Sequence, residues 1–225
     1  MKYTIRGKDM PVVDVELKKG EALYTESGGM AWKSPNVSMT SSMKGGVSGA
    51  VGRMFSGESL FLVTYECTEG MGTISFCSEM PGNILDLDIS TDNPIICQRD
   101  AFMAAEPSVE LKVEFTKRLG AGFFGGEGFI LQKLTGNGKV FLEFSGELTE
   151  YTLKKDQTLQ IDPGYIGAFE HTVQYDLQRV EGIKNMLFSG EGLFLATLSG
   201  PGKVWLQSMP LQNLAAKLHR YMPRK

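Results

Sequence analysis

A chain of 225 residues is long enough to form one large all-β domain and to bury most of the surface that its unfolded form exposes. Its composition, 42% hydrophobic and 22% charged, is ordinary for a soluble globular protein, and its 27 glycines indicate many tight turns. The net charge of −3 argues against nucleic acid as a partner, because nucleic-acid binders gain much of their affinity from basic contacts to phosphate.

The three cysteines, Cys67, Cys77 and Cys97, are an odd number at no spacing typical of a metal site. Each lies in or beside an apolar run, which favours small buried residues in a reducing compartment. The N-terminal residues contain no apolar signal core, and no stretch is long and apolar enough to span a bilayer. The sequence therefore predicts a cytoplasmic protein, and no motif in it calls for a cofactor.

Strand patterns dominate from the N-terminus onward. Residues 13–17 alternate apolar and polar side chains, which predicts a strand with one buried face and one wet face. Residues 85–89 and 148–153 show the same pattern, and each of the three runs leads into a polar turn. Their last apolar residues are 72 (89 − 17) and 64 (153 − 89) positions apart. This spacing indicates that a unit of about 65 residues occurs three times.

A Phe-x-Gly-Glu box recurs with nearly the same period, at residues 55–58, 124–127 and 188–191. The glycines of the three boxes are Gly57, Gly126 and Gly190. We predict that these glycines are needed for the geometry of a turn, because a side chain there would strain the backbone.

Each box leads into a short apolar run and then into a Gly-x-Gly turn, at residues 70–72, 136–138 and 200–202. A second apolar strand follows each turn, so the pattern predicts one β-hairpin in each repeat. At the C-terminus, residues 211–220 carry apolar side chains at helical spacing, which predicts one amphipathic helix.

These patterns predict a single all-β domain, residues 1–225, with three internal repeats at about 12–80, 84–146 and 147–210 before the helix. Units of this size cannot each hold a separate core, so they must stack or close around a shared axis. We predict a closed pseudo-threefold β-barrel, similar to a double-stranded β-helix, because closure leaves few open sheet edges.

The ordered set of motifs resembles a known family. From residue 12 to residue 208 the chain is similar to the altered inheritance of mitochondria protein 24 family, formerly domain of unknown function 124, and to its bacterial members. The likeness rests on the boxes, the Gly-x-Gly turns and the runs Ser-Gly-Pro-Gly at 199–202 and Trp-Leu-Gln-Ser at 205–208. It implies a fold similar to the tryptophan RNA-binding attenuation protein. The family has mitochondrial members linked to inner-membrane organisation, and no catalytic motif comes with it.

The glutamates of the three boxes are the first candidate site. If the threefold axis is real, Glu58, Glu127 and Glu191 lie at equivalent positions, where three converging carboxylates could hold a divalent cation. The simpler interpretation is that each carboxylate accepts hydrogen bonds from turn backbone at the start of a strand. Recurrence favours the simpler interpretation, because every repeat must make the same turn.

The glycine-rich segments before the boxes form a second candidate. They combine basic side chains with apolar ones, which together could grip an anionic lipid surface or a partner protein. The residues of this predicted loop surface are Lys44, Arg53, Met54, Lys117, Arg118, Phe123 and Lys184. The alternative is that the aromatic residues close the end of the barrel and the cations are simply solvated.

Catalytic signatures are missing. His171 and His219 stand alone, without the His-x-His pair of a metal-dependent β-helix enzyme. Ser48 lies near a Gly-x-Ser-x-Gly pattern, but the alternating strands and helices of a hydrolase do not surround it. The Gly-x-Gly turns lack the third glycine and the following helix of a dinucleotide fingerprint.

The leading hypothesis from the sequence is a non-enzymatic binding or scaffold protein that engages a protein partner or a membrane surface through the predicted loop surface. The first alternative is a small-molecule or metal-ion binding protein with its site on the threefold axis. RNA binding by analogy of fold is the second. Exposed sheet edges also leave a homo-oligomer open.

Overall fold

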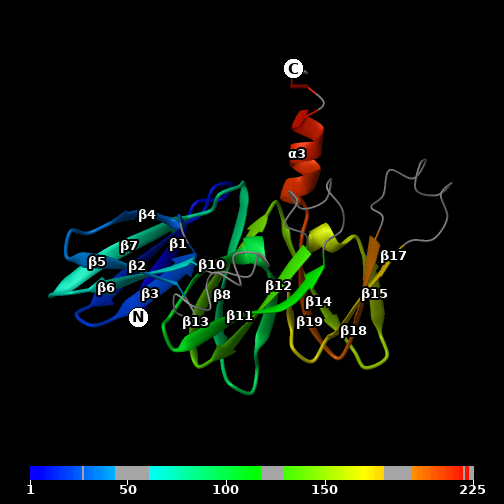
Figure 1. The fold of residues 1–225 in the computed structure, drawn as a ribbon, viewed down its shortest axis with the longest axis horizontal. Coiled ribbons are helices and arrows are strands. Elements are labelled where there is room, and N and C mark those ends of the chain that lie inside the picture. Colours follow the sequence, from blue (N-terminus) through cyan, green and yellow to red (C-terminus); the bar gives the residue numbers. More distant parts are fainter. Residues whose placement is uncertain (27, 44–60, 118–128, 180–193, 220, 223–225) are drawn as a thin grey trace.

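The computed structural model of the chain describes residues 1–26, 28–43, 61–117, 129–179, 194–219 and 221–222. Four open β-sheets follow one another along the long axis of the molecule, and one short α-helix stands at one side (Figure 1). The prediction of a β-rich chain that ends in a helix is therefore confirmed.

All four sheets are antiparallel. The first has the strand order β1 (Lys2–Arg6), β2 (Val12–Lys18), β7 (Met71–Cys77), β4 (Met30–Lys33). The second has the order β5 (Val37–Met43), β6 (Phe61–Cys67), β3 (Ala22–Glu26), β10 (Phe102–Ala105), β13 (Gly138–Ser145), β8 (Gly82–Ile89). The third has the order β11 (Val109–Lys117), β12 (Phe129–Gly136), β9 (Ile95–Gln98), β16 (Ile166–Glu170), β19 (Gly202–Gln207), β14 (Leu148–Leu153). The fourth has the order β15 (Thr158–Ile161), β18 (Phe194–Ser199), β17 (Gln174–Arg179).

One pattern of pairing recurs along the chain. The strands fall into three successive stretches of the chain, β2 to β7, β8 to β13 and β14 to β19, and in each stretch the first strand pairs with the last. Inner strands also pair within each stretch, as β3–β6, β9–β12 and β15–β18. Two further pairs join one stretch to the next. We call β3–β10 the first seam and β9–β16 the second seam.

The predicted closed barrel is wrong for the part of the chain that the structure describes, where each of the four sheets is open. The seams explain why. Strands β3 and β9 use their outer edges to pair with the stretch that follows, so the chain advances from sheet to sheet. Strands β4 and β15 are left at opposite ends of the molecule (Figure 1).

The predicted hairpins are also wrong. Strands β6 and β7 flank the first Gly-x-Gly turn but lie in different sheets, and the same holds for β12 with β13 and for β18 with β19. Each turn is therefore an arch between two packed sheets. Gly136 shows why glycine is needed there, since its φ is +109° and a Cβ would overlap the carbonyl oxygen of Ser108. Turn residues alone do not distinguish an arch from a hairpin, because both need positive φ.

Three hydrophobic clusters lie between successive sheets. The first core, with Val13 and Phe76, joins the first and second sheets; the second core, with Leu142 and Trp205, joins the second and third. The third core, with Phe169 and Leu198, joins the third and fourth. The alternation predicted for residues 13–17 is confirmed in β2, where every second side chain is fully buried.

The predicted C-terminal helix is confirmed as α3 (Leu211–His219), which follows β19 and projects away from the sheets (Figure 1). Two short 3-10 helices, η1 (Arg99–Ala101) and η3 (Pro163–Tyr165), precede β10 and β16. Among the described residues, no helix has the length and apolar character that crossing a membrane requires.

Candidate binding pocket at the first seam

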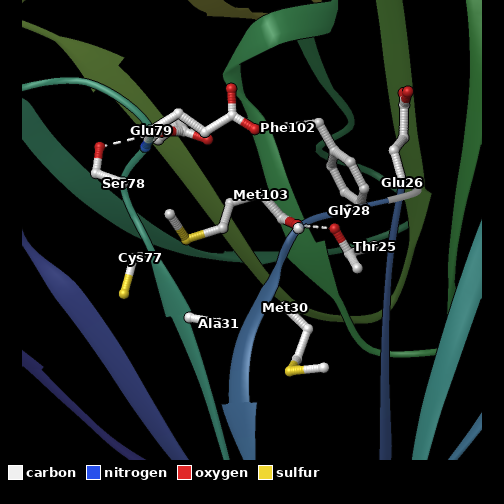
Figure 2. A pocket seen from close by; sticks show the side chains of 12 residues that line it. Thr25, Glu26, Gly28, Met30, Ala31, Cys77, Ser78, Glu79, Phe102 and Met103 are labelled. Carbon is white, nitrogen blue, oxygen red and sulfur yellow. Dashed lines mark hydrogen bonds between the residues drawn. The ribbon is translucent and has the colours of Figure 1, made fainter.

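A pocket of about 260 Å³ lies beside the first seam, between the first and second sheets. The end of β3, the start of β4, the end of β7 and the strands β10 and β13 contribute to its walls. Figure 2 shows the apolar and sulfur-bearing side chains of Met30, Ala31 and Cys77 in the lower half of the view. The polar residues Ser78, Glu79 and Glu26 lie in the upper half.

The floor of this pocket is fixed by a buried hydrogen bond from a side chain to the backbone and by core packing. Thr25 on β3 donates its hydroxyl to the carbonyl oxygen of Met103 at 2.6 Å, which joins the two strands of the seam next to the pocket. Phe102 and Met103 are both buried and continue into the cores on either side. The apolar wall is therefore supported by the hydrophobic cores themselves and is held in place before any ligand binds.

Glu143 on β13 is the most perturbed acid of the pocket. Its carboxylate accepts a hydrogen bond from the Ser78 hydroxyl at 3.0 Å and from the Glu79 backbone N–H at 2.8 Å. Burial raises the pKa of Glu143 to about 7, although both hydrogen bonds favour the ionised form. Among the described residues no cation lies within ion-pair distance of it. Its charge is thus poorly compensated near neutral pH.

Glu26, the last residue of β3, supplies a second carboxylate. One of its oxygens accepts a hydrogen bond from Gln132 Nε2 at 2.6 Å, and the other lies 3.4 Å from Arg99 Nε. Its side chain is about three-quarters buried, so this ion pair is only partly screened by solvent. The pocket therefore carries three carboxylates: Glu26, which has a cationic neighbour, Glu143, and the exposed Glu79 at its rim.

The second seam places amides where the first has these acids. Register defines the correspondence: Leu142 faces Phe102 and Leu206 faces Ile166, each 64 residues apart (206 − 142 and 166 − 102). Glu143 therefore corresponds to Gln207. Tyr24 faces Ala105 in the first seam and Ile96 faces Phe169 in the second, which shifts β3 onto β9 by 72 residues (96 − 24). Glu26 therefore corresponds to Gln98.

The two amides of the second seam are hydrogen-bonded to each other. Gln207 Nε2 donates to Gln98 Oε1 at 3.1 Å and to the Gly164 carbonyl at 3.0 Å. The cavity beside them measures only about 30 Å³; it is lined by Gln98, Gln207 and the start of α3, and also by Glu79, Asp100 and Glu143. Two carboxylates cannot donate to each other in this way when both are ionised. The first seam therefore keeps unused acceptor capacity in a pocket several times larger.

Other chemistry at the pocket is limited. Burial raises the pKa of the Cys77 thiol, which disfavours the reactive thiolate. Neither His171 nor His219 is among the described residues of the lining. In the part of the chain that the structure describes, no group of three or more His, Cys, Asp or Glu side chains is placed to hold a metal ion.

Comparison with known proteins assigns the family. Residues 3–209 match the family model described as mitochondrial biogenesis AIM24. The chain belongs to the AIM24 family. The resemblance noted in the sequence is therefore confirmed, and it extends over nearly the whole fold described above.

Two related proteins from Streptococcus pyogenes support the assignment. An uncharacterized protein from serotype M6 is 30% identical over 232 residues, covering 99% of this chain and 92% of that protein. A crystal structure of an S. pyogenes protein, a structural genomics target, superposes with a TM-score of 0.81 at 28% identity. The match covers 98% of this chain and 99% of that one, so the two folds agree along nearly their full length.

The site residues predicted from the sequence fall outside the described residues. This applies to the box glutamates Glu58, Glu127 and Glu191, to the box glycines Gly57, Gly126 and Gly190, and to Lys44, Arg53, Met54, Arg118, Phe123 and Lys184. Lys117 is the last residue of β11, and its side chain is not among those described. The metal site and the loop surface therefore stay predictions.

Sequence reasoning missed Glu26 and Glu143. A usable signal was present, because aligning the repeats sets Glu26 against Gln98 and Glu143 against Gln207. An acid in one copy and an amide in the next marks a position where charge has been changed while shape is kept. Strand pairing was needed to see that both changes fall on the same seam.

Proposed function

We propose that this AIM24-family protein is a non-enzymatic binding protein whose first-seam pocket takes a small molecule with a protonated amine at one end and an apolar chain at the other. The observation that carries the proposal is the pair of carboxylates, Glu26 and Glu143, standing where the second seam has two amides that satisfy each other. The pocket combines these carboxylates with a free volume of about 260 Å³.

The carboxylates favour a cation. A protonated amine offers three N–H donors, and hydrogen bonds from a charged donor to a carboxylate are about twice as strong as neutral ones. Glu143 receives only neutral donors from Ser78 and Glu79, so an amine would add the missing opposite charge. An anionic ligand would meet the like charges of these glutamates at short range and be repelled.

The remaining walls favour a short apolar chain. Met30, Met103 and Phe102 present thioether and aromatic surface, and methionine adapts its shape to irregular ligands. A volume of about 260 Å³ is just below the range of ~300–1,000 Å³ usual for drug-sized ligands. The ligand class is therefore a small amphiphilic amine rather than a nucleotide or a peptide.

A non-enzymatic role is supported by the residues available. An activated nucleophile needs a lowered pKa or an adjacent base, whereas the pKa of Cys77 is raised. Glu143 alone could exchange a proton, but the described lining offers no partner with the geometry of an acid–base pair. Binding is thus the function that the site supports best.

Three probes with one six-carbon tail and different heads test the proposal: hexylamine, hexanol and hexanoate. We expect hexylamine alone to raise the melting temperature at pH 8. At ten times its Kd the stabilisation is about 1.4 kcal/mol, or roughly 3–6 °C for a domain of this size. Equal shifts with hexanol, or none with hexylamine, would remove the proposal.

Finer features inferred from the sequence remain proposals beside this one. We propose that the recurring strand pairing reflects three internal repeats with a unit like that of the tryptophan RNA-binding attenuation protein, and that the protein is cytoplasmic.

Engagement of a protein partner or an anionic membrane through the predicted loop surface is tested by reversing the charges of Arg53, Lys117 and Lys184 together. Unchanged binding to anionic vesicles and to captured partners would remove that role, and a gel shift at physiological salt tests the RNA alternative.

A further inference from the structure

The two seams of this chain are built alike. In the first, Ala105 of β10 faces Tyr24 of β3; in the second, Phe169 of β16 faces Ile96 of β9. Both pairings are antiparallel, and both follow a bulge at the same place, between Phe102 and Ala104 in β10 and between Ile166 and Ala168 in β16. In both seams, therefore, the corresponding strand edges pair in the same register.

Each end of the molecule has one strand edge that corresponds to one side of a seam but has no partner strand in the described part of the chain. Strand β4 corresponds to β10 and β16: it pairs with β7 and has the same bulge, between Met30 and Trp32. Strand β15 corresponds to β3 and β9 and pairs with β18. Within the described part of the chain, neither strand has a second neighbour. The two edges lie too far apart to meet within one molecule, as Figure 1 shows.

The half-exposed side chain of Trp32 indicates that the β4 edge is a binding surface. The positions that correspond to it are Ala104 and Ala168, and both are completely buried, whereas Trp32 is 49% exposed. The residues that face these positions on the neighbouring strand differ in the opposite way, since they are aromatic beside the two alanines and small beside Trp32. Phe141 and Trp205 lie beside the two alanines, and Ser75 lies beside Trp32. Each pair thus keeps one aromatic ring. The rings of Phe141 and Trp205 are buried, whereas that of Trp32 is half-exposed, with the Arg6 guanidinium 5.8 Å from its centroid.

The third core lacks a contribution that the other two have. The first core is completed by Ala104 and Phe141, which belong to the next stretch of chain, and the second core by Ala168 and Trp205 in the same way. In the described part of the chain no further stretch contributes to the third core in this way, and Ile161 on β15 is one of its residues. By the register of the seams, the residue that would lie opposite Ile161 is Trp32.

We propose that copies of this chain join head to tail, β4 of one copy pairing antiparallel with β15 of the next. Carrying over the register of the second seam sets Trp32 opposite Ile161, Lys33 opposite Gln160 and Ser34 opposite Leu159 of the neighbouring copy. The first sheet of one copy and the fourth sheet of the next become one continuous sheet. The bulge is no obstacle, because β10 and β16 pair across the same one.

Such a contact uses two different surfaces, so it repeats from copy to copy until a ring closes or a filament forms. Light scattering during gel filtration is expected to give masses that are multiples of the 24.7 kDa chain. A monomer at all concentrations up to the millimolar range would overturn the proposal.

A designed disulfide tests the register. Residues directly opposite each other in an antiparallel pair have Cβ atoms about 4.5–5.5 Å apart, within reach of a disulfide after small adjustment. With oxidised glutathione, Lys33→Cys combined with Gln160→Cys is expected to give a ladder of covalent oligomers. Lys33→Cys combined with Thr158→Cys, two residues out of register, is expected to give none. Equal ladders from both would mean random collision and would overturn the proposal.

Mixing of blocked copies tests the head-to-tail sense. Trp32→Glu sets a charge at the β4 edge, and Gln160→Pro disrupts the β15 edge, a position where an edge strand tolerates proline. Each variant alone is expected to lose its large assemblies, and an equal mixture is expected to restore a dimer of one copy of each. Met39→Glu, on the exposed edge strand β5, is the matched control and is expected to assemble like the parent. Failure of the mixture to form a dimer, with both variants folded by circular dichroism, would overturn it.

Discussion

Glu143 on β13 and Gln207 on β19 occupy the same place in two successive seams, and each accepts a backbone N–H at or just after the end of a strand in the preceding sheet. The Glu143 carboxylate accepts the N–H of Glu79 at 2.8 Å, and the Gln207 carbonyl accepts the N–H of Ser145 at 3.1 Å. The backbone contact is thus common to both seams. At these two positions a charge is present in the first seam only, and Glu143 borders both the larger and the smaller cavity.

Glu143→Gln is expected to change how stability depends on pH. The pKa of Glu143 is raised in the folded state from 4.5 to about 7, so the folded protein binds the proton more tightly than the unfolded chain does. The resulting stability is fully present below about pH 4.5 and is lost as pH rises through about 7. We expect the variant to lose this decline, which urea titrations at pH 5, 6, 7 and 8 would measure. A parallel decline in parent and variant would contradict the raised pKa.

The reciprocal change, Gln207→Glu, puts a carboxylate into the second seam. Gln207 is buried and donates to Gln98 and to the Gly164 carbonyl, so an ionised glutamate would face two acceptors and no donor in their place. We expect a loss of about 1–3 kcal/mol at pH 8, becoming smaller toward pH 5 as the new carboxyl is protonated. A loss that does not vary with pH would mean that packing, rather than charge, sets the choice of amide.

Gly136→Ala tests the arch between the second and third sheets. Its φ of +109° is strained for alanine, and the added Cβ would overlap the Ser108 carbonyl oxygen. Gly20→Ala is the control, because its φ is +84° but no atom lies within 4 Å of the new Cβ. We expect Gly136→Ala to be the more destabilising variant by about 1–3 kcal/mol, as measured by chemical denaturation. Equal losses would show that the close approach does not matter.

Phe141→Ala tests whether the first and second sheets pack as one core. Phe141 is completely buried and contacts the Tyr3 ring edge-on, with centroids 5.1 Å apart. Truncation of a buried phenylalanine typically costs about 3–5 kcal/mol. Tyr151→Ala removes an aromatic ring that is 46% exposed and is expected to change stability by no more than about 0.5 kcal/mol. Similar melting temperatures for the two variants would contradict the packing of β1 against β13.

Much of the local structure could be predicted from the sequence. The alternation at residues 13–17 gave β2 correctly because β2 is covered on one face only, and the spacing at 211–220 gave α3. Closure and the hairpins were predicted wrongly for one reason. Apolar period and turn residues report which faces are buried and where the chain reverses, but they carry no information on which strand edges pair. The seams β3–β10 and β9–β16 decide both features.

The pocket was beyond sequence reasoning for the same reason. Glu26 and Glu143 are 117 residues apart (143 − 26), and neither belongs to a motif of known chemistry. Recurrent motifs drew attention to the Phe-x-Gly-Glu boxes, because repetition is visible in a sequence. The informative positions are those where the repeats differ on a shared seam. Aligning the repeats shows the differences, but only the strand register shows that both fall on one seam.

The most direct test of the proposed function is a calorimetric titration of hexylamine at pH 8 into the parent protein and into the double variant Glu26→Gln, Glu143→Gln. The double variant copies the amides of the second seam, so its affinity is expected to fall at least about tenfold, equivalent to 1.4 kcal/mol. The control Glu66→Gln, Glu69→Gln removes two exposed charges away from the pocket and is expected to bind like the parent. Binding of equal strength by the parent and the double variant would contradict the assignment of the first-seam pocket as an amine site.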